Sequence, residues 1–430
     1  MSHRSALVAL SLTIAVAMSA CSTAPTVPTT DATHAPGQGG AGTGVLSIAT
    51  DNPDPLKAVI AAYQKVNPDA MITTQEAPTG YEEFLRTTLV AGTAADIIRI
   101  FPGAGKPTAT GALVKAGMLV DLTDASWSGE LSAAQKAGFG VDGKVYAVPI
   151  GSTGLGPVYN QATLKELGVE IPTTFTQVMD LCAKAKASGK VAYSQFLKDN
   201  KVLLTYALTA PLVYGPDAEF TSEQVAGTKT FAGSGWLKAF QLQKQMQDAG
   251  CFNDGATGTA YNVSFEQVAK GDAVATFAFS DVSGIESLAP AGTVVALAPM
   301  PADDSGDLYL AVADSSGYSV NAKSPNQELA RKFLDFMASA DGQNAYASTG
   351  GAPALPNTSF QPVHPNQQLM LDYINKGKTA AWPDQLWFGN ETRDALDEAA
   401  VAIFLNQDTP ASAVAKLDEA FVKDVAGLSK

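Results

Sequence analysis

The histidines of this chain decide which kinds of catalysis the sequence can support. Of the three histidines, His3 lies in an apolar N-terminal segment and His34 in a stretch rich in Thr, Pro and Gly. Only His364, in "QPVHPN", lies in the part of the chain with the composition of a folded protein. A histidine-rich metal site is therefore excluded. A Ser-His-Asp hydrolase would need His364 itself, and no G-x-S-x-G turn is present to supply a nucleophile.

Two further motifs have the composition of ligand loops without the required spacing. In "FPGAGKPT", Lys106 precedes Pro107 instead of Ser or Thr, and Ile100 stands where a phosphate loop has its first glycine. In "DDSGDLYL", Leu308 occupies the position at which a calcium loop requires glycine. The first motif is therefore not a phosphate loop, and the second is better interpreted as a solvated turn.

Aromatic and acidic side chains are the remaining groups that could bind a ligand or catalyse a reaction. The chain has four Trp, and "AAWPDQLW" places Trp382 and Trp387 on either side of Pro383 in a segment without helical period. Such rings can stack on the faces of sugars, although most Trp side chains pack in a core. A glycoside hydrolase that uses a pair of carboxylates stays open as the enzyme alternative, because spacing in sequence does not report spacing in space.

Alternating strands and helices must position these side chains. Three short β-rich runs are each followed by a helical pattern: "VLSIAT" at 45–50, "MITTQEA" at 71–77 and "DIIRIF" at 96–101. Thr79 and Glu82 have the spacing of a capping box, as do Thr174 and Gln177 further along the chain. The alternation predicts the α/β class with a doubly wound sheet, in which ligands bind beyond the carboxyl ends of strands.

This rule selects the residues that directly follow two of the expected strands. Thr50, Asp51 and Asn52 follow the first strand, and the segment from Phe101 to Gly103 follows the third. We therefore expect these residues at the floor of a ligand site.

Two cysteines remain in the body of the chain. Cys182 lies on the apolar stripe of an expected helix, and Cys251 follows Gly250 at the expected end of another. An even number of cysteines in an exported protein favours a Cys182–Cys251 disulfide. The alternative is two buried free thiols.

The N-terminus has the pattern of an export signal. Residues 1–20 begin with positive charge at Arg4, continue in an apolar run too short to span a bilayer and end in small residues before Cys21. Small residues directly before a cysteine resemble a bacterial lipobox, at which the signal is cut and Cys21 carries lipid such as palmitate. The alternative is an ordinary signal peptide with a chance cysteine. After Cys21, the segment to Gly44 has almost no large apolar side chain, so 21–44 is predicted to be a lipidated cysteine and a disordered tether.

Length and charge limit the remaining possibilities. The body from Val45 to Lys430 is too long for one compact core and predicts two lobes. No later segment is long and apolar enough to cross a bilayer. The formal net charge of −14 disfavours nucleic acid and anionic partners and leaves neutral or cationic ligands.

Two stretches carry a resemblance to a known family. They are "VDGKVYAVPIGSTGLGPVYNQATLKELGVEIPTTFTQVMDLCAKAKASGK" at 141–190 and "GYSVNAKSPNQELARKFLDFMASADGQNAYASTGGAPAL" at 317–355. The chain resembles the extracellular solute-binding proteins of carbohydrate ABC importers, the maltose-binding-protein-like family. The resemblance implies two doubly wound α/β lobes joined by hinge strands. It places the first lobe at 45–150 plus 310–355 and the second at 151–309 plus 356–430.

The resemblance also implies where a ligand is contacted. Contacts are expected from strand ends, from the turn after "DII", from residues just past the hinge and from the segment after "KGDAVATFAFSD". By position these are Asp51, Asn52, Phe101, Ser152, Thr153 and Asp281. Many relatives present Trp where this chain has Asp281, so stacking is expected from Trp382 or Trp387 instead. Tyr81 and Tyr214 are weaker candidates, for which a place on the lobe surface is the alternative.

The function implied by the resemblance is capture and delivery. A small solute, expected to be a mono- or oligosaccharide, is gripped between the lobes and handed to the permease subunits of an ABC transporter. The chain is then a monomer without catalytic groups, metal or cofactor, anchored by lipid to the outer face of the bacterial cytoplasmic membrane. The alternatives are the lipid-anchored glycoside hydrolase and a sensory sugar receptor that signals to a membrane kinase.

Overall fold

The computed structural model describes residues 44–77, 80–104, 106–314 and 316–427. The predicted signal peptide, the lipidation site Cys21 and the tether up to residue 43 lie outside the described residues. Within the described residues, no helix combines the length and the apolar composition needed to cross a membrane.

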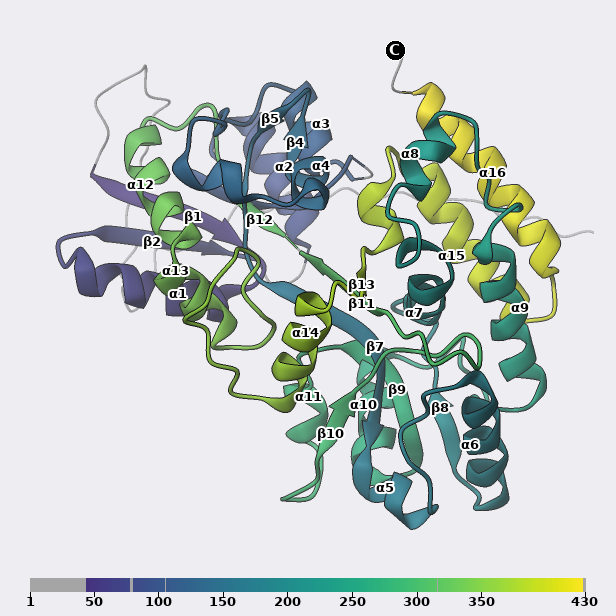
Figure 1. Cartoon of the computed structure of the whole chain (residues 1–430). Helices are drawn as coiled ribbons and strands as arrows, with labels where there is room; N and C mark the ends of the chain where they lie inside the picture. Colours follow the sequence, from purple (N-terminus) through teal and green to yellow (C-terminus); the bar gives the residue numbers. More distant parts are fainter. Residues whose placement is uncertain (1–43, 78–79, 105, 315, 428–430) are drawn as a thin grey trace, which may run out of the picture. The chain divides into compact units, whose positions relative to one another are not determined.

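A five-stranded sheet organises the N-terminal part of the body (Figure 1), in the order β2-β1-β3-β12-β6. Strands β1, β2 and β3 run parallel, whereas β12 is antiparallel to both β3 and β6. The strands are β1 Val45–Thr50, β2 Met71–Glu76, β3 Ile97–Ile100, β6 Val148–Pro149 and β12 Gly317–Val320. The three expected N-terminal strands are thus confirmed.

Helices cover both faces of this sheet because successive side chains of its strands point to opposite sides. Ile48 and Ile97 belong to a core shared with Leu56 of α1, while the next residues along each strand, Ala49 and Ile98, belong to a separate core. The helices around the sheet are α1 Pro53–Val66, α2 Tyr81–Ala91, α3 Thr110–Lys115, α4 Ala133–Phe139, α12 Gln327–Ala338 and α13 Ala340–Ala347, with the 3-10 helix η1 Ser126–Glu130 and the hairpin β4 Gly140–Val141 and β5 Lys144–Val145.

A second sheet has the strand order β13-β11-β7-β9-β8, with β10 paired to β7. The long strand β7 is antiparallel to β9, β10 and β11, whereas β8 and β13 pair in parallel with their neighbours. The strands are β7 Ser152–Asn160, β8 Val191–Ser194, β9 Ala273–Phe279, β10 Val295–Leu297, β11 Leu310–Asp314 and β13 Thr379–Ala380.

Two hydrophobic cores flank this second sheet, one built around Tyr159 and Trp236 and the other around Val158 and Phe265. The C-terminal helices α15 and α16 pack on each other and on α9 (Figure 1). The helices are α5 Gln161–Glu166, α6 Phe175–Ala187, α7 Leu203–Thr209, α8 Phe220–Val225, α9 Gly235–Asp248, α10 Tyr261–Lys270, α11 Ser283–Glu286, α14 Pro365–Asn375, α15 Glu391–Phe404 and α16 Pro410–Ala426, with the π-helix η2 Ala210–Tyr214 and the 3-10 helix η3 Pro383–Leu386.

The described part of the chain passes between the two sheets three times. It passes from β6 to β7, from β11 to β12, and again near Ala352, which bridges to Ser152. The segment Leu310–Asp314 was expected to begin the second part of the first lobe, but it pairs with β7 and β13 and so belongs to the second sheet. The remaining lobe boundaries stay a prediction.

Of the two predicted capping boxes, the one at Thr174 is present and the one at Thr79 is not. Thr174 and Gln177 form the predicted capping box at the start of α6. Helix α2 begins at Tyr81 after Gly80, which has a positive φ of 70° and takes the N-cap position. The capping box expected from Thr79 is therefore wrong in its register, and Thr79 itself lies outside the described residues.

Cys182 on α6 and Cys251 beyond α9 are joined by a disulfide, the pairing favoured from the sequence. Both residues are buried, with exposures of 1% and 0%. The Tyr193 N–H donates to the Cys251 carbonyl oxygen at 2.9 Å, which connects the bridge to strand β8. The disulfide therefore ties two helices to the second sheet.

Removing this bridge should lower the stability of the second lobe. The double variant Cys182→Ala/Cys251→Ala is expected to lose about 2–5 kcal/mol of unfolding free energy, because the unfolded chain gains freedom when the loop is opened. Denaturant unfolding with and without a reducing agent measures this. The reductant should destabilise the wild type and leave the double variant unchanged; equal stability of both proteins under oxidising conditions would contradict the assignment.

Candidate functional site

An ion pair lies at the carboxyl ends of the parallel strands β1 and β3. The Arg99 guanidinium donates through Nη1 to Asp51, and through Nε to the Ser316 hydroxyl at 2.9 Å. The Arg99 side chain is 8% exposed and that of Asp51 is 22% exposed. A carboxylate thus reaches solvent at the edge where α/β sheets bind ligands, while its cation is buried beneath it.

The surroundings of Arg99 keep its guanidinium charged. Burial lowers the pKa of Arg99, but the nearby Tyr346, Tyr318 and Asp51 raise it by more. The pKa of Arg99 therefore lies above the ordinary value for arginine. The guanidinium carbon also lies 5.5 Å from the centre of the Phe101 ring, within the range of a cation–π contact. Arg99 therefore acts as a fixed positive charge under the strand ends.

Asn52, next to Asp51, is also held in place by its neighbours. Its backbone N–H donates to the Thr50 hydroxyl at 3.0 Å, and its side-chain amide donates to the Tyr346 hydroxyl at 3.4 Å. Thr50 in turn shares a hydrogen bond of 2.9 Å with the Tyr318 hydroxyl. Residues from β1, β12 and α13 therefore converge on the end of the first strand.

The end of β9 in the second sheet carries a second pair of predicted residues. Asp281 is exposed and accepts a hydrogen bond of 3.0 Å from the Ser283 N–H. It packs against Gly350, which follows α13: a Cβ atom added to Gly350 would lie 3.3 Å from the Asp281 side chain. The Trp382 ring lies 5.3 Å from that of Phe279, and its Nε1 is buried without a hydrogen-bond partner in the described part of the chain. An aromatic surface and a carboxylate thus lie at the same strand end.

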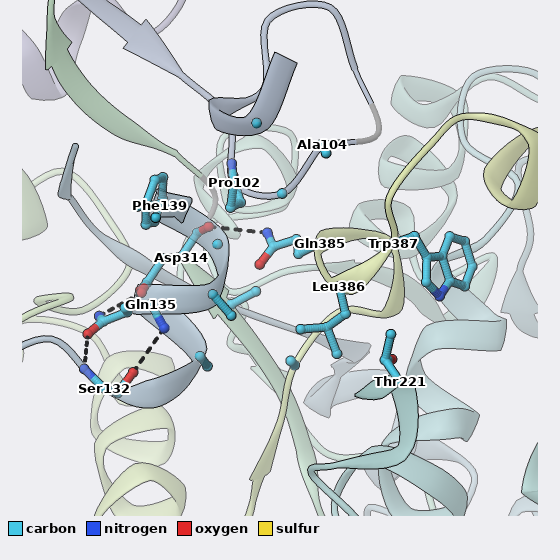
Figure 2. Close-up of a pocket in the computed structure, with 18 of the residues that line it drawn as sticks. Pro102, Ala104, Ser132, Gln135, Phe139, Thr221, Asp314, Gln385, Leu386 and Trp387 are labelled. Atoms are coloured by element: carbon cyan, nitrogen blue, oxygen red, sulfur yellow. Dashed lines mark hydrogen bonds between the residues drawn. The ribbon is translucent and has the colours of Figure 1, made fainter. Parts of the chain in front are cut away.

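A large cavity borders the hinge segments (Figure 2). It has a volume of about 1800 Å³. Its polar centre is Asp314, which accepts from the Gln135 amide at 2.7 Å and from the Ser152 hydroxyl at 2.6 Å. The Gln385 amide donates to the Asp314 carbonyl oxygen at 3.1 Å. Other residues on its walls include Pro102, Ala104, Phe139, Thr221, Leu386 and Trp387.

The polar groups at the centre of this cavity bind mainly one another. Gln135 also caps α4 through its side-chain oxygen and donates to the Ala354 carbonyl at 2.7 Å. Burial raises the pKa of Asp314, although the hydrogen bonds from Ser152 and Gln135 lower it in part. The cluster therefore joins the three hinge passages and leaves few unpaired donors or acceptors for a ligand.

The predicted site residues fall into separate groups. Asp51, Asn52 and Phe101 gather at the first strand edge, and Asp281 and Trp382 at the second. Ser152 borders the cavity, and Thr153 follows it on β7, where adjacent side chains point to opposite faces. Whether these residues contact a ligand stays a prediction.

Three predicted contacts lie in hydrophobic cores instead of on an exposed surface. Tyr81 is 4% exposed, and its hydroxyl donates to the Arg99 carbonyl oxygen at 2.8 Å. Tyr214 and Trp387 are 3% and 1% exposed and pack around Trp236, so only their edges can border the cavity. The physical reason is that each ring fills space between a helix and its neighbours, which outweighs exposure to a small solute.

Sequence reasoning missed four residues that shape this region. They are Arg99, Gln135, Asp314 and Tyr346. A signal was available for Arg99, the single charge inside the otherwise apolar run "IIRIF". Such a charge in a buried strand requires a partner. Among the described residues, no group of three or more His, Cys, Asp or Glu side chains is placed to hold a metal ion.

Comparisons with known proteins identify the family. The family described as bacterial extracellular solute-binding protein matches residues 58–367. The chain therefore belongs to the bacterial extracellular solute-binding protein family.

Relatives share modest identity over most of their length. The chain is 22% identical over 342 residues to the multiple sugar-binding protein of Streptococcus mutans serotype c, with 77% of this chain and 79% of that protein covered. It is 23% identical over 377 residues to the melibiose/raffinose/stachyose-binding protein MelE of Bacillus subtilis, with 84% and 85% covered.

Solved structures agree on the fold. A family 1 extracellular solute-binding protein from Bifidobacterium longum subsp. infantis gives a TM-score of 0.72 at 19% identity, covering 89% of this chain and 100% of that one. The binding protein RafE in complex with raffinose gives 0.70 at 19% identity, covering 89% and 99%. The predicted class of two α/β lobes joined by hinge strands is therefore confirmed.

The raised pKa of Asp314 predicts how stability depends on pH. Protonation of this carboxyl favours the folded state, so its contribution is fully present below the pKa of an unfolded Asp, about 3.9, and is lost as pH rises through the folded value. Between about pH 4 and about pH 7, the wild type should therefore lose unfolding free energy relative to Asp314→Asn. Denaturant titrations across this range measure the difference in unfolding free energy between the two proteins. A difference that stays constant, or that changes in favour of the wild type as pH rises, would contradict the raised pKa of Asp314.

Proposed function

We propose that this chain captures a small neutral solute, a sugar in the first place, between its two lobes and delivers it to the permease subunits of an ABC importer. The observation that carries the proposal is the partly exposed Asp51 carboxylate at the end of β1. It occupies the edge at which sheets of this class bind ligands, in a chain that belongs to a solute-binding family. The relatives named for sugars, MelE among them, support a sugar over other neutral solutes.

The chemistry at the two strand ends suits a hydroxylated ring. Asp51 offers acceptor oxygens and Asn52 offers both a donor and an acceptor, which together can bind several sugar hydroxyls. Trp382, packed on Phe279, offers an aromatic face for the C–H side of a pyranose.

Closure of the lobes would retain the solute. The segments that would bend are the three passages between the sheets, from β6 to β7, from β11 to β12 and near Ala352. A ligand shifts the balance between open and closed forms only through its higher affinity for the closed form. The closed form is then the surface that the permease recognises.

Anchoring completes the proposal. The signal peptide, the lipidated Cys21 and the tether would keep a monomeric receptor at the outer face of the cytoplasmic membrane, close to its transporter. The transporter would supply the energy of import, and the chain itself would catalyse no reaction. These features rest on the N-terminal sequence, which lies outside the described residues.

A ligand screen tests the proposal. The purified chain is heated in the presence of neutral sugars, polyols, amino acids and peptides, and any ligand that raises the melting temperature is recovered for mass analysis. A sugar present at a hundredfold over its dissociation constant should add about 2.7 kcal/mol of stability and be recovered unchanged. Cleaved sugar would indicate a glycoside hydrolase, and no shift with any sugar would contradict the proposal.

Substitution of Trp382 tests the aromatic surface. Trp382→Ala should weaken binding of the sugar found in the screen by more than tenfold, because the stacking face is lost. Trp382→Phe is the matched control and should retain most of the affinity, since it keeps an aromatic ring on Phe279. Calorimetry measures both, and unchanged affinity in the Ala variant would remove Trp382 from the site.

A further inference from the structure

We propose that the Arg99–Asp51 pair makes the site selective for uncharged hydroxylated solutes over their carboxylate derivatives, with Arg99 as the positioning residue. The inference deepens the proposed function and rests on it. It also assigns a role to a buried cation within an otherwise apolar strand.

Arg99 is fixed at both ends of its guanidinium. Nε donates to the hydroxyl of Ser316 at 2.9 Å, and Ser316 lies fully buried in the passage from β11 to β12. Nη1 donates to Asp51, and the Phe101 ring lies on one side of the group. With its side chain only 8% exposed, Arg99 cannot turn outward to meet a ligand. It therefore sets the position of the Asp51 carboxylate.

The charges around the pair balance locally. The second cation near Phe101 is Lys106, with its Nζ 5.1 Å from the ring centre, but it pairs with Glu82 at 2.9 Å. Tyr81 and Tyr318 also lie near the pair and stay neutral, because burial above all, and also the Asp51 charge, raises the pKa of both. A solute at the end of β1 therefore meets the partly exposed carboxylate of Asp51, while the balancing cation, Arg99, is buried beneath it.

This arrangement favours donors over anions. An ionised carboxylate accepts hydrogen bonds and donates none, so Asp51 binds solute hydroxyls through their protons. The carboxylate of a sugar acid would face Asp51 as a like charge at short range. The same solute with a hydroxymethyl group in that place has no such penalty.

Removing the charge of Asp51 should abolish this preference. In Asp51→Asn the guanidinium would remain buried and charged without its anion, a state that proteins tolerate poorly. The like charge that opposes a solute carboxylate would then be gone, and the uncompensated charge of Arg99 would attract it. A purely structural role for the pair would predict lower stability and the same choice among ligands.

The experiment compares dissociation constants for neutral probes and their acids by calorimetry near pH 7. The probe pairs are galactose and galacturonate, glucose and glucuronate, and raffinose with raffinose oxidised to a carboxylate at the terminal galactose. The wild type should prefer the neutral partner by more than tenfold. Asp51→Asn should reduce that ratio at least tenfold.

Matched variants separate positioning from stability. Asp124→Asn removes the carboxylate of the exposed Arg331–Asp124 pair in the same lobe and should leave the ratio unchanged. Arg99→Lys should keep binding of the neutral probe within a few fold, while Arg99→Met should weaken it more than tenfold. If Asp51→Asn does not fold, the double variant Asp51→Asn/Arg99→Met removes both charges together. It should fold and bring the ratio of the two dissociation constants close to one.

The outcomes distinguish failure of the proposed function from failure of the charge selectivity. A wild type that binds no neutral probe overturns the proposed function and this inference with it. A wild type that binds a neutral probe, combined with an unchanged ratio in Asp51→Asn or in the double variant, overturns the selectivity alone. Binding of acetate is a second test. Acetate should raise the melting temperature of Asp51→Asn more than the same concentration of sodium chloride does. If the variant folds and shows no such rise, the inference is contradicted.

Discussion

The three passages of the chain between its two sheets are the constraint on which the rest of the structure depends. Strand β12 enters the first sheet antiparallel to its neighbour β3, directly after β11 has paired with the second sheet. The β6–β7 and β11–β12 hinge segments therefore each connect a strand of one sheet directly to a strand of the other. Because those segments connect the lobes near the ends of β1, β3 and β9, residues from distant parts of the sequence meet there. Asn52 reaches Tyr346 of α13, and Asp281 meets Gly350.

Two polar centres lie along these passages and differ in their chemistry. At the cavity, Asp314 is satisfied by Ser152 and Gln135, so the group stabilises the hinge segments more than it offers contacts to a solute. At the strand ends, Asp51 has one strong partner in Arg99 and still reaches solvent. Buried ion pairs seldom add much stability compared with apolar packing. The buried Arg99 guanidinium therefore matters more for holding the exposed Asp51 carboxylate in place than for overall stability.

Local patterns in the sequence predicted a large part of this architecture. The runs at 45–50 and 96–101 are short, β-rich and followed by helical periods, so their strands could be placed before any tertiary contact was known. The Thr174 capping box and the pairing of Cys182 with Cys251 likewise follow from local spacing and from a simple count. The strands and the capping box depend on neighbours in the chain, whereas the disulfide joins residues 69 positions apart and was predicted from the even number of cysteines in the body.

The features that sequence reasoning placed wrongly depend on distant partners. Strand β11 could join either sheet, and its register against β7 decided the matter. Tyr81 has the same local pattern whether its ring faces solvent or the core, and the carbonyl group of Arg99 fixed its hydroxyl inside. Arg99 itself was overlooked because its partner Asp51 is 48 positions away in the chain. Ion pairs between strand ends are set by sheet order, which periodicity does not report.

The most direct test of this account is the crystal structure of the chain with the sugar identified by the ligand screen. We expect sugar hydroxyls within hydrogen-bond distance of the Asp51 carboxylate, a pyranose face against Trp382, and contacts from both lobes. A sugar seated instead in the cavity around Gln135 and Asp314, with Asp51 untouched, would contradict it.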